Sequence, residues 1–280
     1  MKSTLNRVLV LALALTASPA LAGVIDTADR YWTFDGTADD SVVGVAGTLQ
    51  GDATYTTDRH GNSNSAVSLD GLGDYVSVAA GSDLGAVSSW TISTWVNVSG
   101  FNGASRLYLM DTRGDATSGY GPAMFLDPTN GDDYRFKHFL SPPNTEASVD
   151  VTLDVGDWHM LTLSYDETRS LSARTEFFLD GIPQSGISFT YGPNDPSFPF
   201  DLNHGWRLGT FANAGAGSEY YFQGALDDMA FWNRSLSAAE VGELFTSTPA
   251  VGVPVPPVWT LYVLAALLPT GRSWKRFRTV

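Results

Sequence analysis

Residues 222–245 have the sequence Phe-Gln-Gly-Ala-Leu-Asp-Asp-Met-Ala-Phe-Trp-Asn-Arg-Ser-Leu-Ser-Ala-Ala-Glu-Val-Gly-Glu-Leu-Phe. The first half alternates between two sets of residues, which is typical of a long strand. In the second half, Ser237-Ala-Ala-Glu240 forms a capping box, which predicts the start of a short helix. A long strand followed by one capped helix, late in the chain, predicts the closing element of a β-sandwich.

The chain before this element is also typical of an all-β protein. Short runs of β-branched and aromatic residues alternate with turn residues, and the chain has 28 Gly and 14 Pro. The predicted strands are residues 30–34, 53–57, 66–69, 75–78, 91–98, 107–111, 123–126, 134–140, 158–165, 175–179, 206–208 and 222–232. The pair Asp180-Gly181 predicts a two-residue hairpin turn, because both positions need positive φ. We therefore expect an all-β, two-sheet antiparallel jelly-roll sandwich.

Composition limits the possible chemistry. The chain has 280 residues, of which 43% are hydrophobic, so it can bury the core of one large domain. It contains no cysteine, which excludes disulfides and thiolate metal sites. All 30 acidic residues but only ten basic ones lie between residues 23 and 252, so this body has a net charge of −20. An acidic body repels nucleic acid, and we expect no nucleic-acid partner.

The N-terminus has the three parts of a secretory signal peptide. Lys2 and Arg7 precede an apolar run at residues 8–15, and Ala20-Leu-Ala22 then provides a small-residue cleavage site. We expect residues 1–22 to be a signal peptide that is cleaved after Ala22. The protein is therefore predicted to be exported to the cell envelope or the extracellular space.

Six motifs along the body resemble bacterial laminin-G-like domains of the concanavalin A-like superfamily, in the same order. They are Tyr31-Trp-Thr-Phe-Asp35, residues 66–78, Trp90-Thr-Ile-Ser-Thr-Trp-Val96, residues 157–166, Glu176-Phe-Phe-Leu-Asp-Gly181 and residues 222–232. The resemblance covers about residues 31–247 and implies a jelly roll in which the first and last strands are adjacent. The fold serves lectins, adhesion modules, carbohydrate-binding domains and some hydrolases, so it does not by itself define the function.

Apolar residues at alternating strand positions are expected to form the core between the sheets. These residues are Trp32, Phe34, Leu69, Ile92, Val96, Leu161, Leu163, Phe178, Leu226 and Phe231.

The sequence favours a non-catalytic protein. Hydrolases of the superfamily carry paired glutamates on one strand, one acting as acid and the other as nucleophile. No such run occurs among the six glutamates, which are Glu146, Glu167, Glu176, Glu219, Glu240 and Glu243. No Gly-x-Ser-x-Gly motif surrounds a serine either, which disfavours a serine hydrolase.

Calcium is the cofactor that the resemblance suggests, since many members of the superfamily hold this ion. Asp35 ends the first strand and Asp227 lies in the last, so their carboxylates approach each other if these strands pair. The alternative is that Asp35 caps a turn and Asp227 hydrogen-bonds a neighbouring loop.

Carbohydrate is the expected ligand. Exposed aromatic rings in loops stack on the apolar face of a pyranose, while polar neighbours bind its hydroxyl groups. Tyr120, Phe198, Trp206 and Tyr220 lie in or beside long predicted loops and are the candidate ligand-binding residues. The expected partner is a glycan or an extracellular polysaccharide.

The C-terminal tail has a different composition. Residues 248–257 are a Pro-rich linker, which includes Pro254 and Pro256, and residues 258–280 contain an apolar segment followed by a basic end with Arg276. This tripartite order resembles the PEP-CTERM sorting signals of Gram-negative envelope proteins, without a Glu between the prolines. It implies export and sorting machinery as partners and a membrane association that is at least transient. The alternative is a tail held at the membrane interface by its charges.

These observations divide the chain into a signal peptide (residues 1–22), a laminin-G-like domain (23–247), the linker and the tail. We expect an exported, non-catalytic surface or matrix module that binds carbohydrate. Two alternatives remain, namely a polysaccharide-active enzyme of the same superfamily and a purely structural component of extracellular matrix or biofilm.

Overall fold

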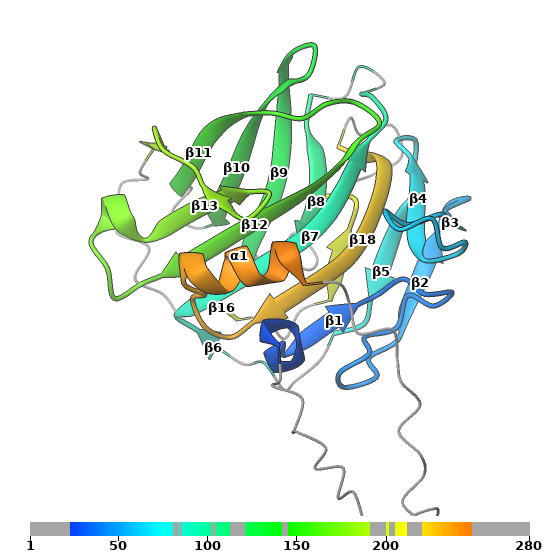
Figure 1. Ribbon diagram of the computed structural model, residues 1–280, viewed down its shortest axis with the longest axis horizontal. Coiled ribbons are helices and arrows are strands. Elements are labelled where there is room, and N and C mark those ends of the chain that lie inside the picture. The colour runs from blue at the N-terminus through cyan, green and yellow to red at the C-terminus, as the bar shows by residue number, and fades with distance from the viewer. Residues whose placement is uncertain are drawn as a thin grey trace, which may run out of the picture. The chain divides into compact units, whose positions relative to one another are not determined.

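The computed structural model describes residues 23–80, 84, 86–101, 103, 105–112, 121–141, 145–190, 200–201, 205–211 and 220–247. This part of the chain is a sandwich of two eight-stranded sheets, which we call sheet A and sheet B (Figure 1). The pairs within both sheets are antiparallel, so the predicted all-β, two-sheet architecture is confirmed. Within the described residues, no helix combines the length and the apolar character that a membrane crossing requires.

Sheet A has the strand order β14-β13-β12-β7-β18-β4-β3, and β1 pairs with β18 beside this row. Its strands are β1 (Arg30–Trp32), β3 (Thr54–Thr56), β4 (Ala66–Asp70), β7 (Ser89–Val98), β12 (Trp158–Asp166), β13 (Thr175–Leu179), β14 (Ile182–Pro183) and β18 (Gln223–Trp232). The first strand, β1, pairs with the last strand, β18, as the resemblance implied.

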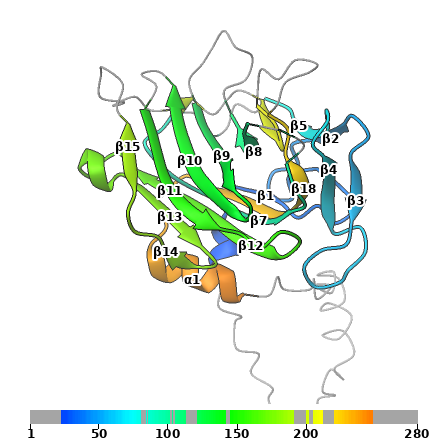
Figure 2. The same ribbon diagram turned by 90° about the horizontal axis from the view of Figure 1, so that it is seen from above.

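Sheet B has the strand order β15-β11-β10-β9-β8-β17-β5-β2, part of which is visible as a row in Figure 2. Its strands are β2 (Gly47–Gln50), β5 (Tyr75–Val78), β8 (Leu107–Asp111), β9 (Gly121–Asn130), β10 (Asp133–Ser141), β11 (Thr145–Thr152), β15 (Ser188–Thr190) and β17 (Trp206–Leu208). A separate pair is formed by β6 (Ala86–Val87) and β16 (Phe200–Asp201), and the helical elements are η1 (Val24–Thr27), η2 (Leu171–Ala173) and α1 (Ala238–Thr246).

The closing strand β18 contains a bulge that the alternating pattern did not predict. Its register with β7 shifts between Asp227 and Ala230, and Asp228 has a φ of 46°. Because the bulge adds a residue, Leu226 and Phe231 both face the core although they are an odd number of residues apart. The capping box that follows is confirmed, since the Ser237 amide donates to Glu240 Oε2 (2.8 Å) and the Glu240 amide donates to Ser237 Oγ (3.3 Å).

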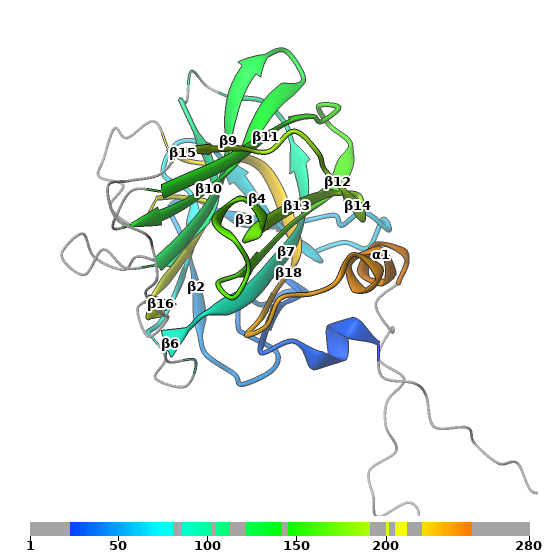
Figure 3. The same cartoon turned by 90° about the vertical axis from the view of Figure 1, so that its left-hand side faces the viewer.

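Nine of the ten predicted core residues lie between the two sheets. The exception is Phe178, which is fully buried on the opposite face of sheet A, against α1 and η1. Figure 3 shows α1 beyond sheet A, on the side away from sheet B. Helix α1 buries Val241 and Leu244 in this second cluster. The part of sheet A that contacts α1 and η1 is therefore buried on both faces.

Candidate functional site

The outer face of sheet B carries a cluster of aromatic side chains. Tyr108 on β8 and Phe125 on β9 stack with ring centroids 4.7 Å apart and planes 19° apart. Phe211 and Tyr220 pack on Tyr108 from the segments after β17 and before β18, with centroid distances of 5.4 and 6.0 Å. Phe139 on β10 packs against the same group. We call these five residues the aromatic cluster. Tyr108 and Phe125 are buried, whereas the other three are half-buried.

A network of charged side chains crosses the strands next to the aromatic cluster. The ammonium group of Lys137 on β10 lies 2.7 Å from Asp127 Oδ2 on β9 and 2.8 Å from Glu146 Oε1 on β11. Burial opposes the charge on Lys137, but its hydrogen bonds to the two carboxylates outweigh burial and raise its pKa. Arg106 lies 3.5 Å from Asp127 Oδ1 and 5.1 Å above the ring of Phe125. The outer face therefore presents fixed donors and acceptors beside aromatic rings.

A third feature of this face lies on β17 and β5. The guanidinium of Arg207 lies 4.8 Å above the ring of Tyr75, and the centroids of Tyr75 and Tyr221 are 6.4 Å apart. The neighbours of Arg207 on β17, Trp206 and Leu208, both point into the core, so Arg207 points outward by strand alternation. Together the three features extend over β11, β10, β9, β8, β17 and β5, which are consecutive in the sheet.

The four predicted ligand-binding residues have different positions. Tyr220 belongs to the aromatic cluster on the outer face of sheet B. Trp206 does not: it is 4% exposed and packs between the sheets, with centroids 5.2 Å from Trp32 and 5.3 Å from Phe231. Its ring is a core side chain, and the prediction that it is an exposed platform for sugar was wrong. Tyr120 and Phe198 lie outside the described residues.

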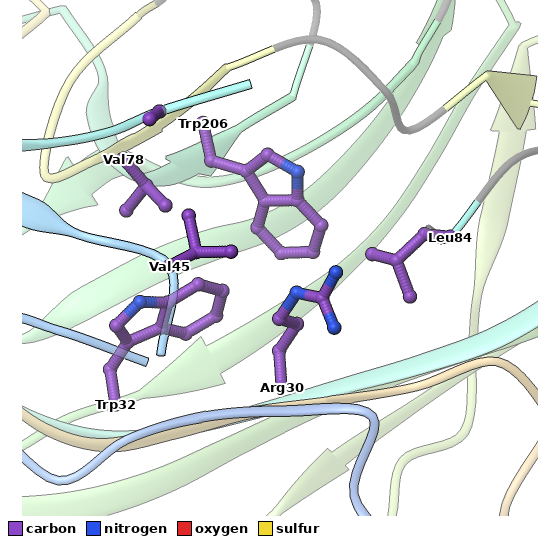
Figure 4. Close-up of a pocket in the computed structure, with 7 residues that line it drawn as sticks. Arg30, Trp32, Val45, Val78, Leu84 and Trp206 are labelled. Carbon is purple, nitrogen blue, oxygen red and sulfur yellow. The ribbon is translucent and has the colours of Figure 1, made fainter. Parts of the chain in front are cut away.

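Trp206 also lines a small pocket (Figure 4). The other lining residues are Arg30, Trp32, Val45, Val78, Ala79 and Leu84. Arg30 forms a buried ion pair with Asp40 at 3.3 Å. The enclosed space is large enough for about one water molecule, which excludes a sugar ring.

The predicted calcium ligands Asp35 and Asp227 have different surroundings. Asp35 is exposed, whereas Asp227 is 2% exposed and its Oδ2 accepts a hydrogen bond from Arg59 Nη1 at 2.6 Å. Arg59 belongs to the loop between β3 and β4, so Asp227 binds a neighbouring loop, as the alternative interpretation states. A calcium ion at Asp227 would have to displace this guanidinium. Calcium binding stays a prediction, which melting temperatures in calcium and in chelator would test.

Arg59 holds two carboxylates of the β18 bulge. Its Nη2 lies 2.7 Å from Asp228 Oδ2, and its guanidinium lies 4.5 Å above the ring of Trp95. Burial and the neighbouring charge of Asp228 raise the pKa of Asp227 to about 8. The hydroxyl of Tyr31 donates to Asp228 as well, and burial raises its pKa. These contacts fix the bulge and connect the loop to sheet A.

One other group of carboxylates has a spacing that suits a metal. Oxygen atoms of Asp52, Asp70 and Asp74 lie within 4.8 Å of one another. However, Asp74 accepts hydrogen bonds from the amides of Asp52 (2.8 Å) and Asp70 (3.1 Å) through its two oxygens. Through these two hydrogen bonds, Asp74 closes the turn between β4 and β5, which gives its carboxylate a structural role.

Comparison with known families assigns the fold. The profile described as the concanavalin A-like lectin/glucanases superfamily matches residues 69–242, which is more than half of the chain. The chain belongs to this superfamily. No curated protein matches its sequence.

Solved structures of this superfamily fold resemble the chain at low sequence identity. Domain 4 of AbnA, an extracellular GH43 arabinanase from Geobacillus stearothermophilus solved in complex with arabinotriose, is 18% identical with a TM-score of 0.54. That match covers 78% of this chain and 98% of the arabinanase domain. The receptor-binding domain of botulinum neurotoxin mosaic serotype C/D is 11% identical with a TM-score of 0.57, and the match covers 80% of this chain and 51% of the toxin domain. At these identities, the similarity establishes the fold alone.

Sequence reasoning about this superfamily member missed most of the outer face of sheet B. It predicted the strands of β8, β9 and β10 but did not follow their outward-facing residues. On β9 those residues are Ala123, Phe125 and Asp127, and on β10 they include Lys137 and Phe139. Alternating positions that combine aromatic and charged side chains were the signal available in the sequence.

The residues of the predicted signal peptide and sorting signal, which are Ala20, Ala22, Pro254, Pro256 and Arg276, lie outside the described residues.

Proposed function

We propose that this protein is an exported, non-catalytic module that binds carbohydrate with the outer face of sheet B. The observation that carries this proposal is the aromatic cluster beside the Lys137 network. Half-buried Tyr220 and Phe211 offer ring edges and faces to the C–H groups of a sugar, and charged groups next to them bind hydroxyls. The proposal is further supported by the arabinanase domain of the same fold, which was solved with arabinotriose.

The size of the face suits a chain of sugars. Strands in a sheet lie about 4.8 Å apart. The six strands from β11 to β5 therefore extend over roughly 24 Å, the length of several sugar units. We propose an extracellular polysaccharide as the ligand. Export through the N-terminal signal and a transient membrane association through the C-terminal tail, both taken from the sequence, would deliver the module to the cell surface or matrix.

The test is a glycan array probed with the purified secreted protein, with and without calcium. For a glycan that binds, we expect Tyr220→Leu to weaken binding about tenfold, because a ring at a binding site is a typical hot spot. Lys137→Gln should weaken it as well, and far-UV circular dichroism would verify that each variant is folded. Arg234→Gln is the matched control, since Arg234 pairs with Glu240 near α1, on the other side of the sandwich.

Absence of binding to any glycan at high protein concentration would refute the proposal. An equal loss of glycan affinity in the Tyr220 and Arg234 variants would show that the binding site is not on sheet B.

A second candidate function is polysaccharide hydrolysis, for which Asp127 and Glu146 are the observation. Both carboxylates lie on the proposed face and contact the same ammonium group. Glycoside hydrolysis requires two carboxyl groups on either side of the sugar, and here the side chain of Lys137 stands between them. We therefore favour binding. Release of reducing ends from a bound polysaccharide, lost in Glu146→Gln, would instead support the enzyme.

A further inference from the structure

Basic side chains are scarce in this acidic body, and almost all are paired. The structure describes nine of the ten Lys and Arg side chains between residues 23 and 252. Seven of these contact a carboxylate, namely Arg30, Arg59, Arg106, Arg135, Lys137, Arg169 and Arg234. Arg174 donates to the carbonyl oxygen of Arg169. Among these nine, Arg207 is the one for which the structure shows neither a hydrogen bond nor an ion pair.

Arg207 is nevertheless held in a defined position. Its strand β17 pairs with β5 on one side and with β8 on the other, so the backbone of Arg207 is fixed by both neighbours. The register places it opposite Ser77 and Asp111. Its guanidinium lies over the ring of Tyr75 at 4.8 Å, and Arg207 is half-buried. A cation–π contact uses none of the N–H donors of a guanidinium in a hydrogen bond, so they stay available to a ligand.

A planar group of N–H donors fits a carboxylate in a bidentate arrangement. Asp111, the nearest carboxylate by register, is fully buried. In a body with three acidic residues for each basic one, an arginine that is fixed and unpaired on the proposed binding face is suited to an acid group supplied by a ligand. We infer that the glycan carries carboxylate groups, as a uronic acid does, and that Arg207 with Tyr75 binds one of them. This inference rests on the proposed function.

The distribution of charge supports this ligand class. Outward-facing residues of sheet B include four basic side chains, Arg106, Arg135, Lys137 and Arg207, and five acidic ones, Asp111, Asp127, Asp133, Glu146 and Asp150. The rest of the body between residues 23 and 252 has six basic and 25 acidic residues. An anionic polymer is therefore repelled by most of the surface and least by the proposed face. The repulsion elsewhere adds orientation to the binding that Arg207 provides.

The experiment uses matched polymers. Polygalacturonate, alginate and hyaluronate are each compared with a form in which the carboxyl groups are reduced to alcohols, by titration of the full secreted chain at fixed physiological salt. We expect at least one acidic polymer to bind at least tenfold more tightly than its reduced form, because charge-assisted bidentate hydrogen bonds are lost on reduction. Arg207→Gln should bind the acidic and the reduced form of the polymer with equal affinity. Arg234→Gln should keep the preference.

A second variant tests whether the effect of Arg207→Gln could come from a folding defect. Tyr75→Leu keeps the arginine but removes the ring beneath it, and it should reduce the preference for the acidic form; melting temperatures verify that both variants fold. Equal affinity of wild type for the acidic and reduced forms of all three polymers, or a preference that survives in Arg207→Gln, would overturn this inference but leave carbohydrate binding intact. If no glycan binds, the proposed function itself is refuted.

Discussion

The two outer faces of the sandwich use the same kind of strand for different purposes. On sheet A, the outward side chains of Met160, Phe178 and Trp232 form one cluster with residues of α1 and η1. Figure 1 shows α1 in front of the strands of sheet A. On sheet B, the outward side chains combine aromatic rings with the Lys137 network, and no described helix covers them. A face that continues the hydrophobic interior contributes to stability, whereas the face that combines rings and charges is the one we propose binds a ligand. The comparison predicts that changes on sheet A alter stability and that changes on sheet B alter binding.

The largest expected effect follows from removing the side chain of Arg59, which connects the loop between β3 and β4 to sheet A. The side chains of Arg59 and Asp227 are 8% and 3% exposed, so Arg59→Met leaves buried Asp227 and half-buried Asp228 without their cation. We expect a loss of about 3–5 kcal/mol in the free energy of unfolding, measured by urea denaturation. The control is Arg135→Met on sheet B, whose pair with Asp150 is largely exposed and is worth roughly 1 kcal/mol or less. Equal losses in both variants would contradict the proposed difference between the faces.

The next effect concerns His138, which belongs to sheet B but points into the core against Trp90 and Tyr165. Burial lowers the pKa of His138 to about 3 from its usual 6.5. Between these values the unfolded chain binds a proton that the folded chain does not, so stability falls as the pH drops below 6.5. By pH 5 the loss is about 2 kcal/mol.

Urea denaturation of wild type and His138→Leu between pH 8 and pH 5 measures this effect. The variant should lose less stability than wild type over that range, because it removes the buried titrating group. His60→Leu, an exposed histidine, is the control and should follow wild type. Parallel pH profiles for wild type and His138→Leu would show that His138 is not the source of acid sensitivity.

The comparison also shows where the sequence was sufficient. The closing strand and its helix were predicted because Ser237 and Glu240 form a local capping box, and local hydrogen bonds need no tertiary context. Asp180 and Gly181 were predicted as a hairpin turn for the same reason, and their φ angles are 51° and 76°. Nine of the ten residues predicted for the core lie between the sheets, although strict alternation would put Leu226 and Phe231 on opposite faces of β18.

Where tertiary contacts decide the structure, the sequence was less informative. Phe178 alternates like a core residue, and the outer face it occupies is buried only because α1 returns to cover it. Strand β11 was missed although its inward residues Ala147, Val149 and Val151 alternate with polar ones, because the segment has no aromatic residue to mark it as part of the core. The partnership of Arg59 with Asp227 joins residues 168 positions apart, and no local pattern indicates it.

The smallest expected effect tests the helix that covers sheet A. Ser237→Ala removes the side-chain half of the capping box, so the free energy of unfolding should fall by about 1 kcal/mol. Ser237→Asp keeps an acceptor at the cap and should retain most of the stability. Glycan affinity should be the same in both variants and in wild type, because α1 lies on the face opposite the proposed site. A weakened cap that also weakened glycan binding would show that the two faces are energetically coupled, and binding could then no longer be assigned to sheet B alone.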